Sequence, residues 1–258
     1  MDNSDFRNPI AQAGYNAKHG TRKYVCDRWI SWDADAVFEN GYMTTGSPYD
    51  QPIEPAKIDT AKTYTAAVGL ADGRIIAYSG NFANGFGYKA SGIFGGLSTD
   101  NITPYVRIAS NQNVVWAALY EGEYTAETLP SYVYKGYATE LAECQRYYEN
   151  SWFNSTKSTE NEYMGVCVHA SGLDAIIEYK VPKRIAATVT FYPTSPSETW
   201  RVYNDAGYRP LASVEAYARN GVRGFMVRGT KDTVNDTSVW AYGKAIPLFG
   251  QWEASADL

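Results

Sequence analysis

The sequence is poor in the residues that most catalytic and metal-binding sites need. Its 258 residues include only 2 histidines and 3 cysteines, Cys26, Cys144 and Cys167. The odd cysteine count, without CxxC spacing, argues against a disulfide framework or a zinc site. We expect buried free thiols of a protein made in a reducing cytoplasm, and no metal or cofactor.

Basic charge and long apolar runs are also scarce. The net charge is -5, and no basic stripe is present, which argues against nucleic-acid binding. No apolar run reaches the length of a membrane-spanning helix, so we expect no membrane insertion. The opening residues, MDNSDFRNP, are polar and acidic, unlike the basic and apolar regions of a signal peptide.

Aromatic residues are abundant, with 22 tyrosines, 9 phenylalanines and 7 tryptophans. Tyrosine suits the surface of a β-sheet. It also suits interfaces where a flat ring meets a partner and its hydroxyl stays in water. The high aromatic content therefore indicates either well-filled β cores or exposed binding surfaces.

One stretch predicts an amphipathic helix, from Tyr137 to Trp152. Its candidate core residues recur at spacings of three and four, which places them on one helical face; they are Leu141, Cys144, Tyr148 and Trp152. The rest of the chain reads as short strands and turns. We therefore expect the helix to connect two β domains.

The other segments alternate β-branched and aromatic residues at about ten-residue intervals, with glycine and asparagine between them, which predicts antiparallel sheets. Asp72-Gly73 marks the turn of a hairpin over 62–78. The stretch from Tyr24 to Trp32 predicts one continuous strand, and adjacent Asp27 and Arg28 would then point to opposite faces.

These patterns predict a mostly β protein in three parts. Residues 1–136 hold about eight strands, for which an N-terminal jelly-roll β-sandwich is the expected fold. Residues 137–153 form the connecting helix, and residues 154–258 form a smaller C-terminal β-sandwich.

Several motifs resemble a carbohydrate-binding-module-like jelly roll found in phage tail-fibre and prophage structural proteins. The specific motif is the CQRYY run at Cys144–Tyr148 within the helix. Looser matches are Cys26–Trp29, Gln51–Glu54, Lys62–Thr65, Ala118–Gly122, and Val181–Arg184 followed by Ala187–Thr190. The resemblance spans nearly the whole chain.

The resemblance implies a non-enzymatic virion protein, assembled in the host bacterial cytoplasm. It would be a tail fibre or receptor-binding tip that docks on host surface glycan. Its partners would be further copies in a homotrimer and other virion proteins. In the family such modules usually close a longer chain, whereas here the module starts near residue 5. Attachment to the particle would then use the short N-terminus, a partner protein or the module itself.

Two alternatives remain open. The first is a capsid-bound head fibre or decoration protein without a glycan role. The second is a glycan-cleaving hydrolase, which needs a pair of carboxylates that the sequence context does not single out. Neither His19 nor His169 lies beside a GxSxG-like nucleophile, so no catalytic residue is assigned.

Aromatic rings in or beside turn-rich stretches are the candidate glycan-binding residues, because a sugar can lay its apolar face on such a ring. They are Trp32, Tyr42, Tyr49, Phe86, Tyr88, Trp200, Tyr203 and Tyr208. Asp27 and Trp29 are expected to be structural, together with the four core residues of the helix. We expect Asp27 to tie the N-terminal turns to the sheet.

The resemblance and the tyrosine-rich composition predict a homotrimer. Light scattering of the purified protein should give three times the mass of one chain. A stable monomer at micromolar concentration would contradict this prediction.

Overall fold

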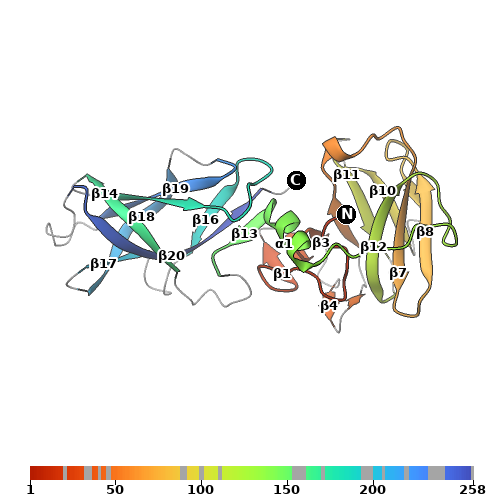
Figure 1. Ribbon diagram of the computed structural model, residues 1–258, viewed down its shortest axis with the longest axis horizontal. Coiled ribbons are helices and arrows are strands. Elements are labelled where there is room, and N and C mark those ends of the chain that lie inside the picture. Colours follow the sequence, from red (N-terminus) through yellow and green to blue (C-terminus); the bar gives the residue numbers. More distant parts are fainter. Residues whose placement is uncertain are drawn as a thin grey trace. The chain divides into compact units, whose positions relative to one another are not determined.

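The structure is a computed structural model of the chain (Figure 1). It describes residues 1–19, 22–31, 37–39, 42–44, 48–87, 92–98, 102–109, 112–152, 161–169, 172–192, 200–204, 207–217, 221–231 and 242–256. The described residues are mostly β-strand with one α-helix, which confirms the predicted fold class at this level. Contacts divide the chain into unit 1, Met1–Cys144, and unit 2, Gln145–Asp257.

Unit 1 contains two antiparallel sheets. The seven-stranded sheet has the order β1-β2-β3-β6-β11-β10-β9, and the five-stranded sheet has the order β4-β5-β12-β7-β8. The strands of the first are β1 (Ala17–His19), β2 (Arg22–Cys26), β3 (Trp29–Ser31), β6 (Tyr49–Pro52), β9 (Phe86–Gly87), β10 (Ile93–Leu97) and β11 (Pro104–Ile108). Those of the second are β4 (Val37–Glu39), β5 (Tyr42–Thr44), β7 (Tyr64–Leu70), β8 (Ile75–Gly80) and β12 (Val114–Glu121). A short 3-10 helix, η1, covers Pro55–Lys57.

The predicted hairpin over 62–78 is present as β7 and β8. The two strands pair in antiparallel register from Tyr64↔Gly80 to Gly69↔Ile75. Gly73 has φ +88° in the connecting turn. A left-handed residue in a tight turn is a local requirement that glycine meets without strain, which is why the sequence predicts this hairpin well.

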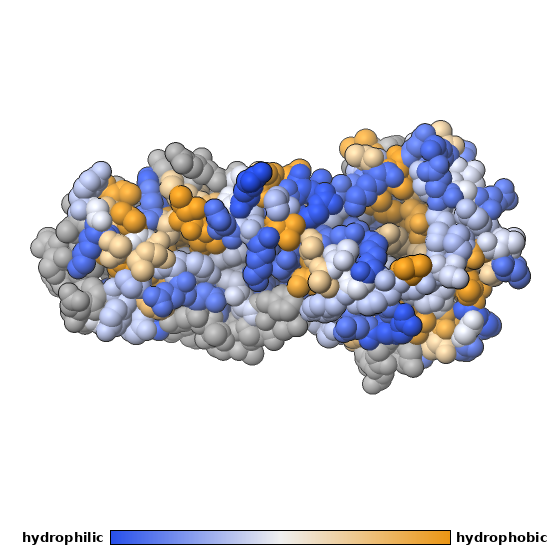
Figure 2. Space-filling model, viewed as in Figure 1, coloured by the Kyte–Doolittle hydropathy of each residue, from blue (hydrophilic) through white to orange (hydrophobic). Residues whose placement is uncertain are grey.

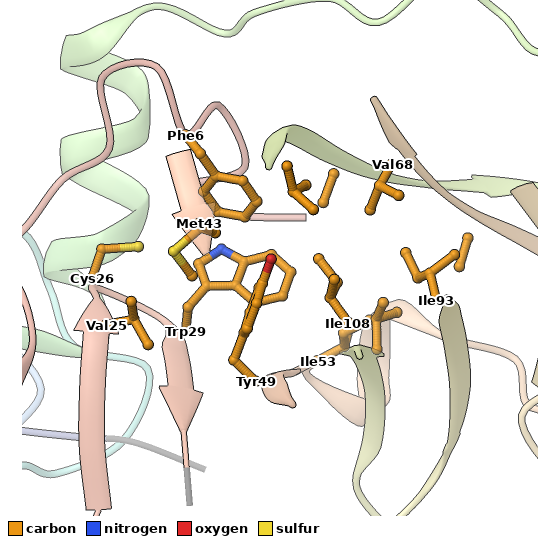
Figure 3. Close-up of a cluster of buried hydrophobic side chains, with 14 of the residues drawn as sticks. Phe6, Val25, Cys26, Trp29, Met43, Tyr49, Ile53, Val68, Ile93 and Ile108 are labelled. Atoms are coloured by element: carbon orange, nitrogen blue, oxygen red, sulfur yellow. The ribbon is translucent and has the colours of Figure 1, made fainter. Parts of the chain in front are cut away.

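The core of unit 1 is built around three aromatic rings (Figure 3). Phe6, Trp29 and Tyr49 are completely buried, and Trp29 lies with its ring centroid 5.2 Å from Phe6 and 5.5 Å from Tyr49. Their rings meet edge to face, an arrangement that adds about 0.5–1.5 kcal/mol per pair to the area they bury. Aliphatic side chains extend this cluster, including those of Val68, Ile93, Ile53 and Ile108.

The predicted single strand from Tyr24 to Trp32 is wrong, because the chain reverses at Asp27 and Arg28. Strand β2 pairs with β3 across this turn, and Arg28 has φ +72°. The Asp27 carboxylate accepts hydrogen bonds from the Gln12 backbone N–H at 3.0 Å and from Gln12 Nε2 at 2.8 Å. The turn is thus held by a partner distant in sequence, which a local pattern cannot reveal.

The N-terminal segment, residues 2–12, is largely buried and centres on Asn3. Asn3 adopts a left-handed conformation with φ 52°. Its Nδ2 donates to the carbonyls of Ile10 at 2.9 Å and Asp27 at 2.7 Å, and its Oδ1 accepts from the Ile10 N–H at 2.6 Å. Its backbone carbonyl accepts the Trp29 indole N–H at 2.9 Å. The Asn3 side chain therefore binds the segment to the β2–β3 turn.

The same segment also extends the five-stranded sheet. Asp5 forms an antiparallel bridge with Trp116 on β12. The Phe6 N–H donates to the Val115 carbonyl at 2.9 Å, and the Ala117 N–H donates to the Ser4 carbonyl at 2.9 Å. Residues 4–6 therefore act as a short additional strand along β12.

Helix α1 covers Tyr137–Gln145, which is shorter than the predicted 137–153. Tyr148–Asn150 forms strand β13 instead, paired with β20 (Ala245–Ser255) from Tyr148↔Ser255 to Asn150↔Glu253. Long-range pairing with the C-terminal strand therefore overrides the helical periodicity. Glu140 of α1 is buried, with 3% of its surface exposed, and accepts the Asn3 backbone N–H.

Unit 2 contains an eight-stranded sheet. Its strands are β13 (Tyr148–Asn150), β14 (Asn161–His169), β15 (Gly172–Glu178), β16 (Thr188–Tyr192), β17 (Arg201–Asn204), β18 (Gly207–Tyr217), β19 (Gly224–Lys231) and β20 (Ala245–Ser255). The order is β13-β20-β14-β15-β19-β18-β17, with β16 paired to β20. Because β17 pairs with both β18 and β20, the sheet closes on itself. One closed sheet replaces the two separate sheets of the predicted sandwich.

A buried ion pair lies at the start of unit 2. Lys183 Nζ lies 2.7 Å from Glu149 Oε2, and both side chains are essentially inaccessible to solvent. The ammonium also donates to the Gln145 carbonyl at 2.5 Å and lies 4.4 Å from the centre of the Tyr179 ring. Burial lowers the pKa of Lys183. These partners compensate a charge that would otherwise be costly to bury.

We predict that Asn3→Ala strongly destabilises unit 1. The change removes three hydrogen bonds and leaves buried backbone groups unpaired, each costing about 1–3 kcal/mol. Alanine is also strained in the left-handed region. A loss of about 3 kcal/mol or more is expected in urea unfolding, with exposed Asn84→Ala as the control. A loss below about 1 kcal/mol would contradict this role of Asn3.

We predict that Glu140→Gln stabilises the protein at pH 7. Burial raises the pKa of Glu140 above its ordinary value of 4.5. The unfolded state therefore ionises first, and the resulting penalty on folding grows as pH rises through the folded-state pKa. Glutamine removes that penalty and still accepts the Asn3 N–H.

Thermal unfolding across pH measures this effect, with exposed Glu123→Gln as the control. The stabilisation by Glu140→Gln should shrink as the pH falls through the raised folded-state pKa towards 4.5, and it should be largely absent below that value. An equal or growing advantage at low pH would contradict the assignment.

Candidate functional site

The predicted glycan-binding residues fall into three groups. Trp32 and Tyr88 lie outside the described residues, and Tyr42 lies on β5 with its side chain outside that description. Three rings are buried, and two are exposed and adjacent. Among the predicted residues whose side chains are described, the structure brings together Tyr203 and Tyr208 on the surface.

Tyr49, Phe86 and Trp200 have exposed fractions of 0%, 6% and 1%, so their rings offer no face to a sugar. This corrects the prediction for these three residues. Tyr49 belongs to the core of unit 1, and Trp200 stacks on Tyr163 at 5.7 Å in unit 2. Turn-rich sequence around a ring does not determine whether the ring points inward.

Neighbouring glycines explain how two of these rings are buried. A Cβ at Gly250 would lie 1.9 Å from the Trp200 ring, and one at Gly80 would lie 2.0 Å from the Phe86 side chain. Each ring therefore lies directly against a strand backbone. Glycines within strands were the available sequence signal for this packing.

The residues predicted to be structural are placed as follows. Asp27, Trp29 and Cys144 are buried in unit 1, and Leu141 is half-buried on α1. Tyr148 and Trp152 are buried but belong to unit 2, where the Tyr148 hydroxyl donates to Glu253 Oε2 at 2.9 Å. All three cysteines are free and buried, as predicted.

The first candidate site is an exposed aromatic cluster of unit 2, here called the tyrosine ledge: Arg201, Tyr203, Tyr208 and Phe249. Tyr203 and Tyr208 are 46% and 47% exposed. Their ring centroids lie 5.2 Å apart at 68°, and Tyr208 contacts Phe249 at 5.3 Å. The Arg201 guanidinium lies 4.0 Å from the centre of the Tyr208 ring.

Strand register creates the ledge. Tyr203 and Tyr208 face each other across β17 and β18, and Arg201 pairs with Phe249 on β20. Alternation along β17 places Arg201 and Tyr203 on the outer face and buries Val202 inside the closed sheet. The outer face thus carries two half-exposed phenol rings, their hydroxyls and a cation.

The second candidate site is a cleft of unit 1, here called the β12 groove, with a volume of about 310 Å³. It is lined by Met1, Ser4, Ala117–Tyr120, Pro130–Val133 and Lys135. On the outward face of β12, large and small residues alternate as Trp116, Ala118 and Tyr120. Of these three residues, Ala118 and Tyr120 line the groove.

The walls of the β12 groove are fixed by packing. The Trp116 indole covers Gly69, where a Cβ would lie 2.0 Å from the indole Nε1. Tyr132 stacks on Trp116 at 4.9 Å and 8°, and its hydroxyl lies 3.2 Å from Ser4 Oγ. Burial raises the pKa of Tyr132 to about 12, so the hydroxyl is protonated at neutral pH.

Lys135 supplies the charge beside the β12 groove. Its ammonium donates to Glu143 Oε2 at 2.6 Å and to the Met1 carbonyl at 2.7 Å. No function was predicted for this groove from the sequence. The sequence features that could have indicated it are the large-small-large alternation on β12 and the tyrosine-rich segment that follows the strand.

Potential metal ligands and buried carboxylates of the described residues were compared with the needs of a metal or catalytic site. Within it, no group of three histidine, cysteine, aspartate or glutamate side chains could hold a metal ion. Buried carboxylates there have structural partners, since Glu149 pairs with Lys183 and Glu253 accepts the hydroxyls of Tyr148 and Tyr192. His19 and His169 lie on described strands, but their side chains are not among the described parts of the structure.

The surface view shows hydrophobic residues in separate patches among hydrophilic ones on the visible face (Figure 2). Among the described residues, no helix combines the length and apolar character needed to cross a bilayer. A comparison with known proteins found no match to a family model, a curated protein or a solved structure.

Proposed function

We propose that this protein is a non-enzymatic phage virion appendage protein, a tail fibre or receptor-binding tip. It docks on glycan at the host cell surface through the tyrosine ledge. Its N-terminal unit is a carbohydrate-binding-module-like jelly roll. The motif resemblance around the CQRYY run supports the virion assignment, and the ledge supports the choice of ligand.

The observation that carries the proposal is the exposed pair Tyr203 and Tyr208. Burial of either ring in the sheet interior would have removed aromatic area from water, yet both remain about half exposed. A sugar ring can lay its apolar face on such a ring while its hydroxyls bind polar groups at the rim. The tyrosine hydroxyls and the Arg201 guanidinium supply those groups.

Binding by a small ledge is weak for one copy, so the proposal includes a homotrimer. Three copies held by one particle would engage a repetitive glycan at once and gain affinity through avidity. Other virion proteins would hold the chain in the particle.

A capsid-bound head fibre or decoration protein is the first alternative, and it needs no glycan contact. A glycan hydrolase is the second, and it needs two carboxylates roughly 5–10 Å apart with different pKa values. Localising the protein in intact particles with a labelled antibody separates tail from capsid. Release of reducing sugar from host polysaccharide separates binding from cleavage.

We predict that Tyr203→Ala and Tyr208→Ala each weaken binding to purified host surface polysaccharide by about tenfold, which corresponds to about 1.4 kcal/mol. Both changes remove a half-exposed ring, so the fold should persist. Tyr242→Ala is the matched control, because this tyrosine of the same unit is 84% exposed and lies outside the ledge. Biolayer interferometry on immobilised polysaccharide measures the effect.

Equal binding by the ledge variants, the control and the unchanged protein would exclude the ledge as the contact. Absence of binding to every host glycan on an array would favour the head-fibre alternative. Time-dependent sugar release, abolished by Asp27→Asn, would establish the hydrolase.

A further inference from the structure

Strands β17 and β18 hold Tyr203 and Tyr208 at the closest spacing that an antiparallel pair provides. The Leu211 N–H donates to the Trp200 carbonyl at 2.8 Å, so these two residues form a hydrogen-bonded pair. Hydrogen-bonded and non-hydrogen-bonded pairs alternate along an antiparallel ladder. Tyr203 and Tyr208 pair three positions further along β17, which makes them a non-hydrogen-bonded pair. The Cα atoms of such a pair are about 4.5 Å apart, and the side chains are closer than in a hydrogen-bonded pair.

Packing against neighbouring side chains fixes the two rings beside each other. The Arg201 guanidinium lies 4.0 Å from the centre of the Tyr208 ring, and Phe249 contacts the same ring at 5.3 Å. The Tyr203 ring lies 5.2 Å from Tyr208. Each tyrosine is nearly half exposed, so reagents in the solvent can reach both phenols.

The pair is distinctive among the tyrosines of the described chain. Tyr15, Tyr134, Tyr137 and Tyr242 are also exposed, but within the described residues none of them makes a ring contact with another tyrosine.

One other tyrosine pair lies partly at the surface. Tyr120 and Tyr124 are in ring contact at the longer centroid distance of 6.2 Å, and burial raises the pKa of Tyr120. The ledge pair is therefore both closer and more accessible than this second pair.

We propose that Tyr203 and Tyr208 form an oxidative cross-linking site, where a one-electron oxidant such as a peroxidase with hydrogen peroxide joins them as dityrosine. Each phenol loses one electron and one proton and becomes a tyrosyl radical. The two radicals combine through ring carbons next to their hydroxyls, and the hydrogens on those carbons move back to the phenol oxygens. In total the protein loses two hydrogen atoms, and one hydrogen peroxide takes them up and becomes two water molecules.

Coupling within one chain is favoured over coupling between chains. Groups joined by a short stretch of chain meet at an effective concentration of about millimolar or more. In a micromolar protein solution this is about a thousandfold advantage over two separate chains. The product should therefore be an internal link that ties β17 to β18 and fixes the two rings of the ledge relative to each other.

This inference does not rest on the proposed glycan-binding function, because the reaction needs the ring pair and an oxidant but no sugar. It gives the tyrosine ledge a second chemical property, covalent closure between its two strands. Failure of the cross-link and failure of glycan binding are therefore measured separately.

The test is oxidation of the full chain at micromolar concentration with horseradish peroxidase and a limited amount of hydrogen peroxide. We expect dityrosine fluorescence, a loss of the mass of two hydrogen atoms per chain, and a product that runs as one chain on a denaturing gel. Digestion with a protease that cuts before Asp205 separates Tyr203 from Tyr208 in the sequence. The two resulting peptides should remain joined in the oxidised protein and separate in the untreated protein.

Tyr203→Phe and Tyr208→Phe are the test variants, because each removes a phenol hydroxyl and keeps the ring that packs in the ledge. Either change should remove most of the dityrosine fluorescence of the whole protein. Tyr242→Phe is the matched control, since this tyrosine is 84% exposed and lies outside the ledge. Its fluorescence yield should equal that of the unchanged protein.

Three results would overturn the inference. They are the absence of dityrosine, a bond mapped to another pair such as Tyr120 and Tyr124, and products formed only between chains. Full fluorescence in Tyr203→Phe or Tyr208→Phe would also overturn it. If the cross-link forms as expected while Tyr203→Ala and Tyr208→Ala bind polysaccharide normally, the cross-linking site stands and the glycan contact fails.

Discussion

The left-handed conformation of Asn3 is the constraint on which the arrangement of unit 1 depends. Its side chain replaces the missing strand partners of Ile10 and of the Asp27 turn. Its carbonyl holds the indole of Trp29, the largest ring of the core, and its N–H meets Glu140 on α1. One residue thus joins the N-terminal segment, the β2–β3 turn, the aromatic core and the helix. The same backbone turn takes the chain away from β12 and leaves the edge that forms the β12 groove.

Local features of the fold could be predicted from the sequence, whereas features fixed by distant partners could not. The β7–β8 hairpin depends on Asp72-Gly73 alone, and the start of α1 at Tyr137 follows from its periodicity. The end of α1 could not be predicted, because Tyr148 pairs with Ser255 more than a hundred residues later. The inward packing of Trp200 depends on Gly250, and the tight turn at Asp27 depends on Gln12. Tyr203 and Tyr208 of the candidate site could be predicted because they flank a short turn. The β12 groove could not be predicted, because it forms only where three segments of the chain come together.

The ledge offers aromatic faces and a cation, which would suit the apolar face and hydroxyls of many sugars. It is small, and the visible surface carries its hydrophobic residues in separate patches (Figure 2). Small sites of this kind favour multivalent attachment, in which the repetition of sites on a particle supplies the affinity.

A crystal structure of the protein soaked with an oligosaccharide from the surface of a host cell tests the central claim most directly. The account predicts uncleaved sugar stacked on Tyr203 or Tyr208. Sugar bound elsewhere with the ledge empty, or a cleaved product in its place, would contradict it.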